Sequence, residues 1–267
     1  AYTTHPYRWP TIGLELAHIA QATLEDVKDF FYRFYAPNNA ILSIAGNISF
    51  DETIRLVEKW FGPIPRREVH PRMLPQEPKQ TEIRRMTVER DVPLDTLYMA
   101  FHTCNRTHPD YYAVDMLSDL LANGSSSRLI EHLVKQKQIF SQIDAYITGS
   151  CDEGLLKITG KPLPGISLEE AEAYIWQELE TLCQTMPEER ELEKVKNRYE
   201  AEQTIKSVNF LNNAVNMAYF ELIGQAEDVN DEVRNYHSVT PQDIQRVANK
   251  VFKEENSSVL YYKAVSQ

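Results

Sequence analysis

The sequence lacks several features that indicate a protein's class. Its three cysteines, Cys104, Cys151 and Cys183, are too few and too scattered for a disulfide framework or a zinc cluster, so we expect reduced, mostly packed thiols. No apolar run approaches the ~18 residues that a membrane-spanning helix requires. The net charge of −11 argues against a surface for nucleic acid or for anionic membranes. We therefore expect a globular protein with no membrane span and no nucleic-acid partner.

Catalytic motifs are also missing. None of the zinc patterns H-x-x-E-H, H-E-x-x-H and their variants occurs, and Glu15 with His18 would supply only two ligands. There is no P-loop, G-x-G-x-x-G or G-x-S-x-G sequence. The sequence Gly-Ser-Ser-Ser-Arg at 124–128 could form an anion nest or hold a serine nucleophile, but no histidine accompanies it in a catalytic pattern. A simpler interpretation is that Gly124 ends one helix and a following serine caps the next. The residues themselves predict no catalytic group and no metal ligand.

A helix followed by a strand occurs twice in the sequence. Residues 23–45 and 240–262 each begin with a threonine, have an aspartate three residues later, and reach an asparagine sixteen residues after the threonine. The Thr-x-x-Asp spacing predicts a capped helix, and the apolar stretch after the asparagine predicts a short buried strand. The copies start 217 residues apart, which is a domain-sized spacing. A chance recurrence is the alternative, because a capped helix before a strand is common in α/β proteins.

Other segments indicate how the chain is divided. Prolines crowd residues 65–80, which predicts a stiff, extended linker. Residues 1–64 contain only a helix, a strand and a helix, too little to bury one face of a sheet. Residues 81–267 have the pattern β-β-α-α-β-β-α-α-α-α-β, which predicts a complete α+β domain with an antiparallel sheet flanked by helices. Capping-box spacing marks five predicted helix starts, at Thr23, Ser49, Ser167, Thr185 and Thr240, and asparagines at 209, 212, 213 and 216 are expected to bend a long helix.

Several segments together resemble the pitrilysin/insulinase superfamily of zinc metallopeptidases, especially its mitochondrial-processing-peptidase-like branch. His5-Pro6-Tyr7 followed by Ile12-Gly13 is similar to the segment that these proteins place after their zinc site. Residues 30–47, FFYRFYAPNNAILSIAGN, resemble the family's helix-to-strand signature. Residues 124–129 resemble the turn that opens a helix in the second domain, and residues 240–252 resemble the closing helix. The resemblance covers nearly the whole chain in register.

The resemblance implies tandem homologous domains, with the first one truncated in this chain. Residues 1–64 would be the end of the first domain, 65–80 the linker and 81–267 the complete second domain. The family binds zinc through H-x-x-E-H and a later glutamate, all of which would precede Ala1. Zinc is therefore expected for the full-length protein and not for this chain. The sequence does not indicate the cellular compartment.

The resemblance also points to candidate cleft residues. Active relatives often carry an arginine and, seven residues later, a tyrosine, and these two side chains hold the substrate backbone. Aligned from the serine-rich turn, the two positions are occupied here by Val134 and Ser141. Ser127 and Arg128, in the turn itself, are the other two candidates. Neither replacement can supply a guanidinium or a phenol. Two functions stay open. The chain is a fragment of a zinc metalloendopeptidase-like protein that acts on extended polypeptides and is inactive alone, or it is a non-catalytic structural or substrate-presenting subunit. The expected partners are a polypeptide substrate and another peptidase-like subunit in a homo- or heterodimer.

Overall fold

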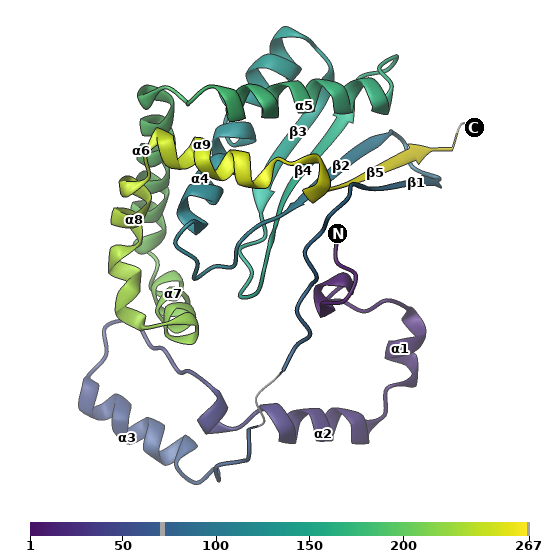
Figure 1. Ribbon diagram of the computed structural model, residues 1–267. Helices are drawn as coiled ribbons and strands as arrows, with labels where there is room; N and C mark the ends of the chain where they lie inside the picture. The colour runs from purple at the N-terminus through teal and green to yellow at the C-terminus, as the bar shows by residue number, and fades with distance from the viewer. Residues whose placement is uncertain (70–72, 266–267) are drawn as a thin grey trace. The chain divides into compact units, whose positions relative to one another are not determined.

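The computed structural model describes residues 1–69 and 73–265 (Figure 1). Their contacts divide the chain into two compact units. The first, which we call the sheet unit, consists of Ala1, Lys79–Gln203 and Asp231–Gln267. The second, the helical unit, consists of Tyr2–Pro78 and Thr204–Asn230. The predicted division at 1–64, 65–80 and 81–267 stays a prediction, and its residues 70–72 and 266–267 lie outside the described residues.

The sheet unit is built on one five-stranded sheet with the order β1-β5-β2-β4-β3. The strands are β1 (Arg84–Arg90), β2 (Thr96–His102), β3 (Phe140–Ile147), β4 (Leu155–Pro162) and β5 (Ser257–Ala264). The pairs β5–β2, β2–β4 and β4–β3 are antiparallel, whereas β1 runs parallel to β5. The predicted α+β class with flanking helices is confirmed. The parallel pair arises because β5 lies between β1 and β2, which are neighbours only in sequence.

The helices of this unit are α4 (Tyr111–Ala122), the π-helix η3 (Ile130–Gln136), α5 (Leu168–Gln184), most of α6 (Glu189–Ser207), α8 (Glu232–Ser238) and α9 (Pro241–Val251), and the short turn η5 (Glu254–Asn256) leads into β5. Figure 1 shows α4, α5 and α9 gathered on the same side of the sheet. Side chains alternate along a strand, and in β2 the residues Leu97, Met99 and Phe101 are fully buried toward these helices. The ring of Phe101 meets Trp176 and Phe252 edge-on, with centroids 5.6 and 5.2 Å away. Each such burial contributes about 1.5–3 kcal/mol.

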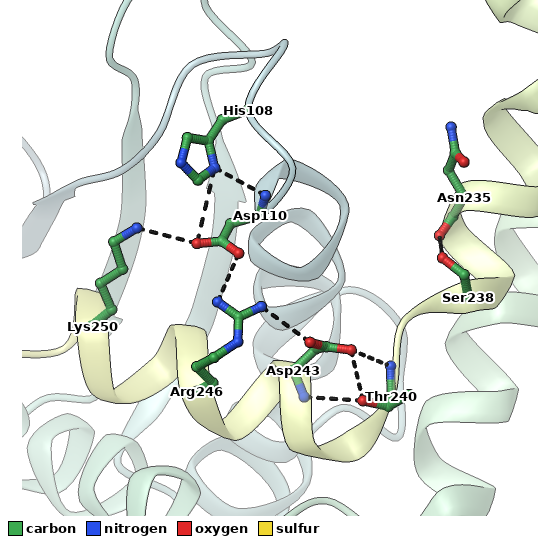
Figure 2. A network of polar contacts seen from close by, with 8 residues as sticks. All are labelled: His108, Asp110, Asn235, Ser238, Thr240, Asp243, Arg246 and Lys250. Carbon is green, nitrogen blue, oxygen red and sulfur yellow. Dashed lines mark hydrogen bonds and ion pairs between the residues drawn. The ribbon is translucent and has the colours of Figure 1, made fainter.

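A polar network fastens α9 to the start of α4 (Figure 2). The carboxylate of Asp110 accepts hydrogen bonds from Arg246 at 2.7 Å and from Lys250 at 3.1 Å, both on α9. Burial opposes ionisation of Asp110, but these two cations outweigh it and lower its pKa. Arg246 also reaches Asp243 at 3.0 Å, so one arginine joins the N-terminal turn of α9 to α4.

Both copies of the repeated helix are capped as predicted. In α2 (Leu24–Phe34), the Asp26 amide donates to the Thr23 hydroxyl at 3.2 Å and the Thr23 amide donates to the Asp26 carboxylate at 2.9 Å. In α9, Thr240 and Asp243 make the same two bonds at 3.2 and 3.1 Å. Two capping boxes at equivalent positions confirm the helical half of the repeat.

The strand half of the repeat is found only in the second copy. Residues 257–264 form β5, but the strand predicted over residues 41–44 is wrong, since the described residues 2–69 and 73–78 contain no strand. Ile41, Leu42 and Ile44 are exposed. A strand needs neighbours for its backbone groups, and β5 finds them in β1 and β2, whereas the helical unit offers no described strand as a neighbour.

Four of the five predicted helix starts are confirmed, because α2, α3 (Phe50–Phe61), α5 and α9 begin directly after Thr23, Ser49, Ser167 and Thr240. The helical unit holds η1 (Pro6–Arg8), α1 (Leu16–Gln21), α2, η2 (Pro37–Asn39), α3, α7 (Phe210–Ile223) and most of η4 (Ala226–Asp231). The bend expected at the asparagines is a break: Asn209 accepts from the amides of Leu211 and Asn212 and caps α7. The predicted helix start at Thr185 is wrong, because its amide continues the last turn of α5 by donating to the Thr181 carbonyl.

Candidate functional site

The predicted site begins at the serine turn, residues 123–128, which connects α4 to the next helical segment. Gly124 follows the end of α4 with φ at +106°, a left-handed conformation that favours glycine. A Cβ at Gly124 would also lie 3.0 Å from the guanidinium of Arg198. The predicted helix end at Gly124 is confirmed, and helical residues resume at Arg128.

Ser127 is a structural residue of this turn. It is 3% exposed, and its hydroxyl donates to the Gly124 carbonyl at 2.7 Å. Its carbonyl accepts from the Glu131 amide at 2.8 Å, which starts the hydrogen bonds of the following helix. The expected serine cap is therefore only partly formed, because the hydroxyl turns back to Gly124 instead of accepting from the next helix. Because the hydroxyl donates its proton to the Gly124 carbonyl, that proton is not directed at a general base, as it would be in an activated serine nucleophile.

Arg128 is held by α6. Its Nε and Nη2 atoms each lie 2.8 Å from a carboxylate oxygen of Glu191, in a two-pronged ion pair. The two side chains are only 15% and 19% exposed. A planar guanidinium facing a carboxylate in this way is the strongest geometry for such a pair. The arginine predicted in the cleft is thus engaged within the fold.

Two more residues of α6 fasten the serine turn. The ammonium of Lys194 donates to the carbonyl and the hydroxyl of Ser126, both at 3.0 Å. Arg198 donates to the Asn123 carbonyl and, at 2.7 Å, to the carboxylate of Asp119 in α4. These residues and the preceding glutamate recur every three or four positions, so they share one face of α6. Contacts from this face of α6 therefore hold the serine turn at both of its ends and in between.

The next segment carries Val134 in an unusual helix. In η3 the Lys137 amide donates to the His132 carbonyl, five residues back, at 2.9 Å. The helix ends at Gln136, and Gln138, two residues beyond it, is a non-glycine residue with φ at +53°. Val134 is half-buried and packs against the core. π-Helices are rare and often lie at functional sites, so the backbone here is distinctive although valine supplies no polar group.

Ser141 occupies a β-bulge on the edge strand β3. Phe140 pairs with Pro162 and Gln142 with Lys161, which leaves Ser141 as the extra residue. Its hydroxyl donates to the Lys161 carbonyl at 3.1 Å. The four predicted residues therefore follow one stretch of chain from the serine turn to β3, but each is tied to different neighbours. Their role in a substrate cleft stays a prediction.

A buried polar cluster near α4 was not predicted from the sequence. The hydroxyl of Tyr236 donates to Asp115 at 2.5 Å, and its ring stacks on Tyr199 with centroids 3.7 Å apart. Arg106 pairs with Glu232 beside them. Burial raises the pKa of Asp115 to about 6, and the bond from Tyr236 only partly opposes this. These residues come from a loop and three helices, so no local spacing could have revealed the cluster.

The side chains that the structure describes do not fit a zinc ion. Zinc sites in proteins use three or four His, Cys, Asp or Glu ligands. In the ranges 1–69 and 73–265 no group of three or more such side chains is placed to hold a metal. His132 lies 2.7 Å from Glu178 and His237 lies 3.0 Å from Glu200, each facing a carboxylate as in an ion pair.

Within residues 1–69 and 73–265, no helix combines the length and the apolar character needed to cross a bilayer.

Comparison with known proteins shows the family. The family model described as "Peptidase M16 inactive domain" matches residues 21–199. The zinc protease PqqE of Helicobacter pylori is 29% identical over 268 residues, covering 98% of this chain and 60% of the relative. The probable mitochondrial-processing peptidase subunit beta of Schizosaccharomyces pombe is 29% identical over 168 residues, or 58% of this chain and 36% of the relative.

Solved structures agree with this assignment. The crystal structure of a protease from Helicobacter pylori superposes with a TM-score of 0.89 at 28% identity, over 98% of this chain and 64% of that one. The crystal structure of a peptidase M16 inactive domain from Pseudomonas fluorescens superposes with a TM-score of 0.82 at 16% identity. The superposition covers 99% of this chain and 63% of that one. The chain spans about 60% of the length of PqqE. The predicted kinship with pitrilysin/insulinase-type zinc peptidases is confirmed, and the chain belongs to the peptidase M16 inactive-domain family.

Proposed function

We propose that this chain is the non-catalytic part of a zinc metalloendopeptidase-like protein that acts on extended polypeptides. The observation that carries the proposal is the match of 98% of the chain to a zinc protease of which it covers only 60%. The family model that it matches is described as inactive, and the described residues offer no zinc donor set. Zinc and the water that it activates would then come from another part of the protein.

The helical unit supports the tandem-domain organisation proposed for residues 1–64, 65–80 and 81–267. In α9, Ile244 and Val247 are 0% exposed because they pack on the core of the sheet unit. Their counterparts in α2, Val27 and Phe30, are each 58% exposed. An amphipathic helix with the same capping box and an uncovered apolar face fits a domain whose own sheet is supplied by further residues.

The residues at 134 and 141 favour a second candidate function. Valine and serine there cannot hold a substrate backbone as arginine and tyrosine would. A chain that lacks this pair, and whose described residues offer no zinc donor set, suits a structural or substrate-presenting subunit in a dimer with another peptidase-like chain. The fold is also found in complex III2 from Candida albicans, with a TM-score of 0.80 at 14% identity, a likeness of fold alone.

Metal analysis with a quenched-peptide assay tests the leading proposal on the purified chain. We expect no stoichiometric zinc and no cleavage of extended peptides. One zinc per chain together with chelator-sensitive cleavage would overturn the proposal, because the site would then lie within these residues.

The encoded residues ahead of Ala1 separate the two candidates. An H-x-x-E-H motif there supports the enzyme, and cleavage by the longer protein should then require a partner that brings the arginine–tyrosine pair. Absence of the motif supports the non-catalytic subunit. Cleavage by the longer protein without any partner would refute the idea that the pair must be borrowed.

A further inference from the structure

One face of the sheet is turned away from α4, α5 and α9. Because side chains alternate along each strand, the register places every second residue on this face, which we call the open face. Met86, Tyr98 and Tyr146 on it are 63%, 39% and 49% exposed. The open face consists of Arg84, Met86, Val88 and Arg90 in β1, Ser258, Leu260, Tyr262 and Ala264 in β5, Thr96, Tyr98, Ala100 and His102 in β2, Leu155, Lys157, Thr159 and Lys161 in β4, and Gln142, Asp144 and Tyr146 in β3.

The centre of the open face is hollow and lined with apolar and aromatic groups. A depression of about 510 Å³ is bordered by Met86, Tyr98, Tyr146 and Leu260, among others. Tyr98 and Leu260 are direct cross-strand neighbours, and the ring of Tyr98 meets that of Tyr262 edge-on at 6.4 Å. A volume of this size is in the range of ligand sites, and exposed apolar surface gathered in one place is typical of binding surfaces.

The charge of the open face is opposite to that of the chain. Of its residues, Arg84, Arg90, Lys157 and Lys161 are basic and only Asp144 is acidic. In the whole chain, 39 acidic residues outnumber 28 basic ones. The Asp144 carboxylate already accepts a hydrogen bond from Gln142 at 2.9 Å. A local excess of positive charge around a hollow attracts a negatively charged partner.

The open face also engages a peptide backbone within the sheet unit. The carbonyl oxygen of Ala1 accepts a hydrogen bond from the guanidinium of Arg84 and lies 3.1 Å from Nε2 of His102. Two side chains of this face can therefore hold a main-chain carbonyl above the strands. This contact favours a polypeptide over a nucleic acid, whose backbone offers phosphates instead.

We propose that the open face docks an extended polypeptide segment in which acidic side chains stand beside apolar ones. The apolar side chains would enter the hollow, and the carboxylates would meet Arg84 and Lys157 at its border. Five strands spaced about 4.8 Å apart make a face about 19 Å wide, which about six residues of extended chain would cross. The inference rests on the proposed function, since it gives the class of polypeptide that the non-catalytic part would hold for cleavage elsewhere.

Binding to labelled peptides tests the proposal on the whole 267-residue chain without added zinc. Three peptides of equal length are compared by fluorescence anisotropy: one alternating glutamate with leucine or phenylalanine, one with glutamine and one with lysine in place of glutamate. We expect the acidic peptide to bind about tenfold more tightly than the neutral one, and more weakly as salt rises. The basic peptide should bind most weakly of the three.

Two variants locate the site, and one serves as the control. Lys157→Glu should weaken binding of the acidic peptide about fivefold or more, because an attraction becomes a repulsion. Lys253→Glu makes the same change in net charge at an exposed position after α9 and should leave the affinity within about twofold. Met86→Ser should weaken binding of the acidic and neutral peptides alike, since it removes apolar surface. Circular dichroism checks that each variant is folded.

Several results would overturn the proposal. Equal affinity for the three peptides, or equal losses from the Lys157 and Lys253 variants, would show that the open face does not select acidic segments. Tighter binding of a single-stranded oligonucleotide than of the acidic peptide would point to nucleic acid. The proposed function is overturned by a different result, namely bound zinc and peptide cleavage by the chain alone. The two failures can therefore be told apart.

Discussion

Arg128 and Glu191, 63 positions apart in sequence, face each other in a two-pronged ion pair that joins the serine turn to α6. Replacing Glu191 by glutamine removes the charge and leaves a poorly exposed guanidinium without its carboxylate. We expect the free energy of unfolding to fall by about 2 kcal/mol. Chemical denaturation measures the loss.

Glu131→Gln is the matched control. Glu131 also pairs with a basic residue, Lys135, but in an exposed position within one helix. Such pairs contribute little, so the control should unfold as the wild type does. If Glu191→Gln unfolds like this control, the pair does not fasten the turn.

The duplicated capping box gives a second prediction. Thr240→Ala removes the cap of a helix whose apolar face is buried in the sheet unit, and it should destabilise that unit by about 1 kcal/mol. Thr23→Ala removes the same cap from α2, in the helical unit, and should leave the sheet unit unchanged. Hydrogen exchange of the amides in β2 and β5 measures both. Similar effects of the two variants would contradict the separation into units.

Asp115 predicts a pH dependence. Its pKa in the folded protein, raised to about 6, is above its usual value of 3.8, so the folded state binds the proton more tightly than the unfolded state. This contribution to stability is fully present below about pH 4 and is lost as pH rises to about 6. Asp115→Asn keeps an acceptor for Tyr236 but cannot titrate. The stability of the wild type relative to this variant should therefore fall from pH 4 to pH 6, and a constant difference would refute the prediction.

Gly160 predicts a steric effect in the core. It lies on β4 opposite Leu97 and Ile143, and a Cβ there would come within 2.5 Å of the buried ring of Phe140. Gly160→Ala should destabilise the protein by about 1–3 kcal/mol, because the packed ring cannot move freely. In a Phe140→Leu background the Gly160→Ala substitution should destabilise the protein less. An equal cost in both backgrounds would show that the ring is not the obstacle.

The sequence predicted the elements whose signals are local. The capping boxes of Thr23 and Thr240 and the glycine turn at 124 each depend on residues within one turn of helix, and each was found. The strand expected at 41–44 failed because a strand depends on neighbours that no local pattern records.

The candidate site shows the same limit. Family resemblance singled out residues 127, 128, 134 and 141, but not the partners that hold them. Glu191, Lys194 and Arg198 lie on one face of α6, a helix of low apolar content, and a run of charges is usually solvated. Only the fold shows that these charges meet the serine turn.

The position of β5 in the sheet has a consequence for synthesis on the ribosome. Arg84 in β1 pairs with Ser258 in β5, and β2 takes its other neighbour from the same late strand. Pairings between such distant residues are slow to form, because closing the long intervening loop costs entropy before the strand contacts can offset that cost. Among the described strands, β1 therefore has no partner and β2 has only β4 until residues 257–264 have been made, and this interval is when the nascent chain depends most on protection from aggregation.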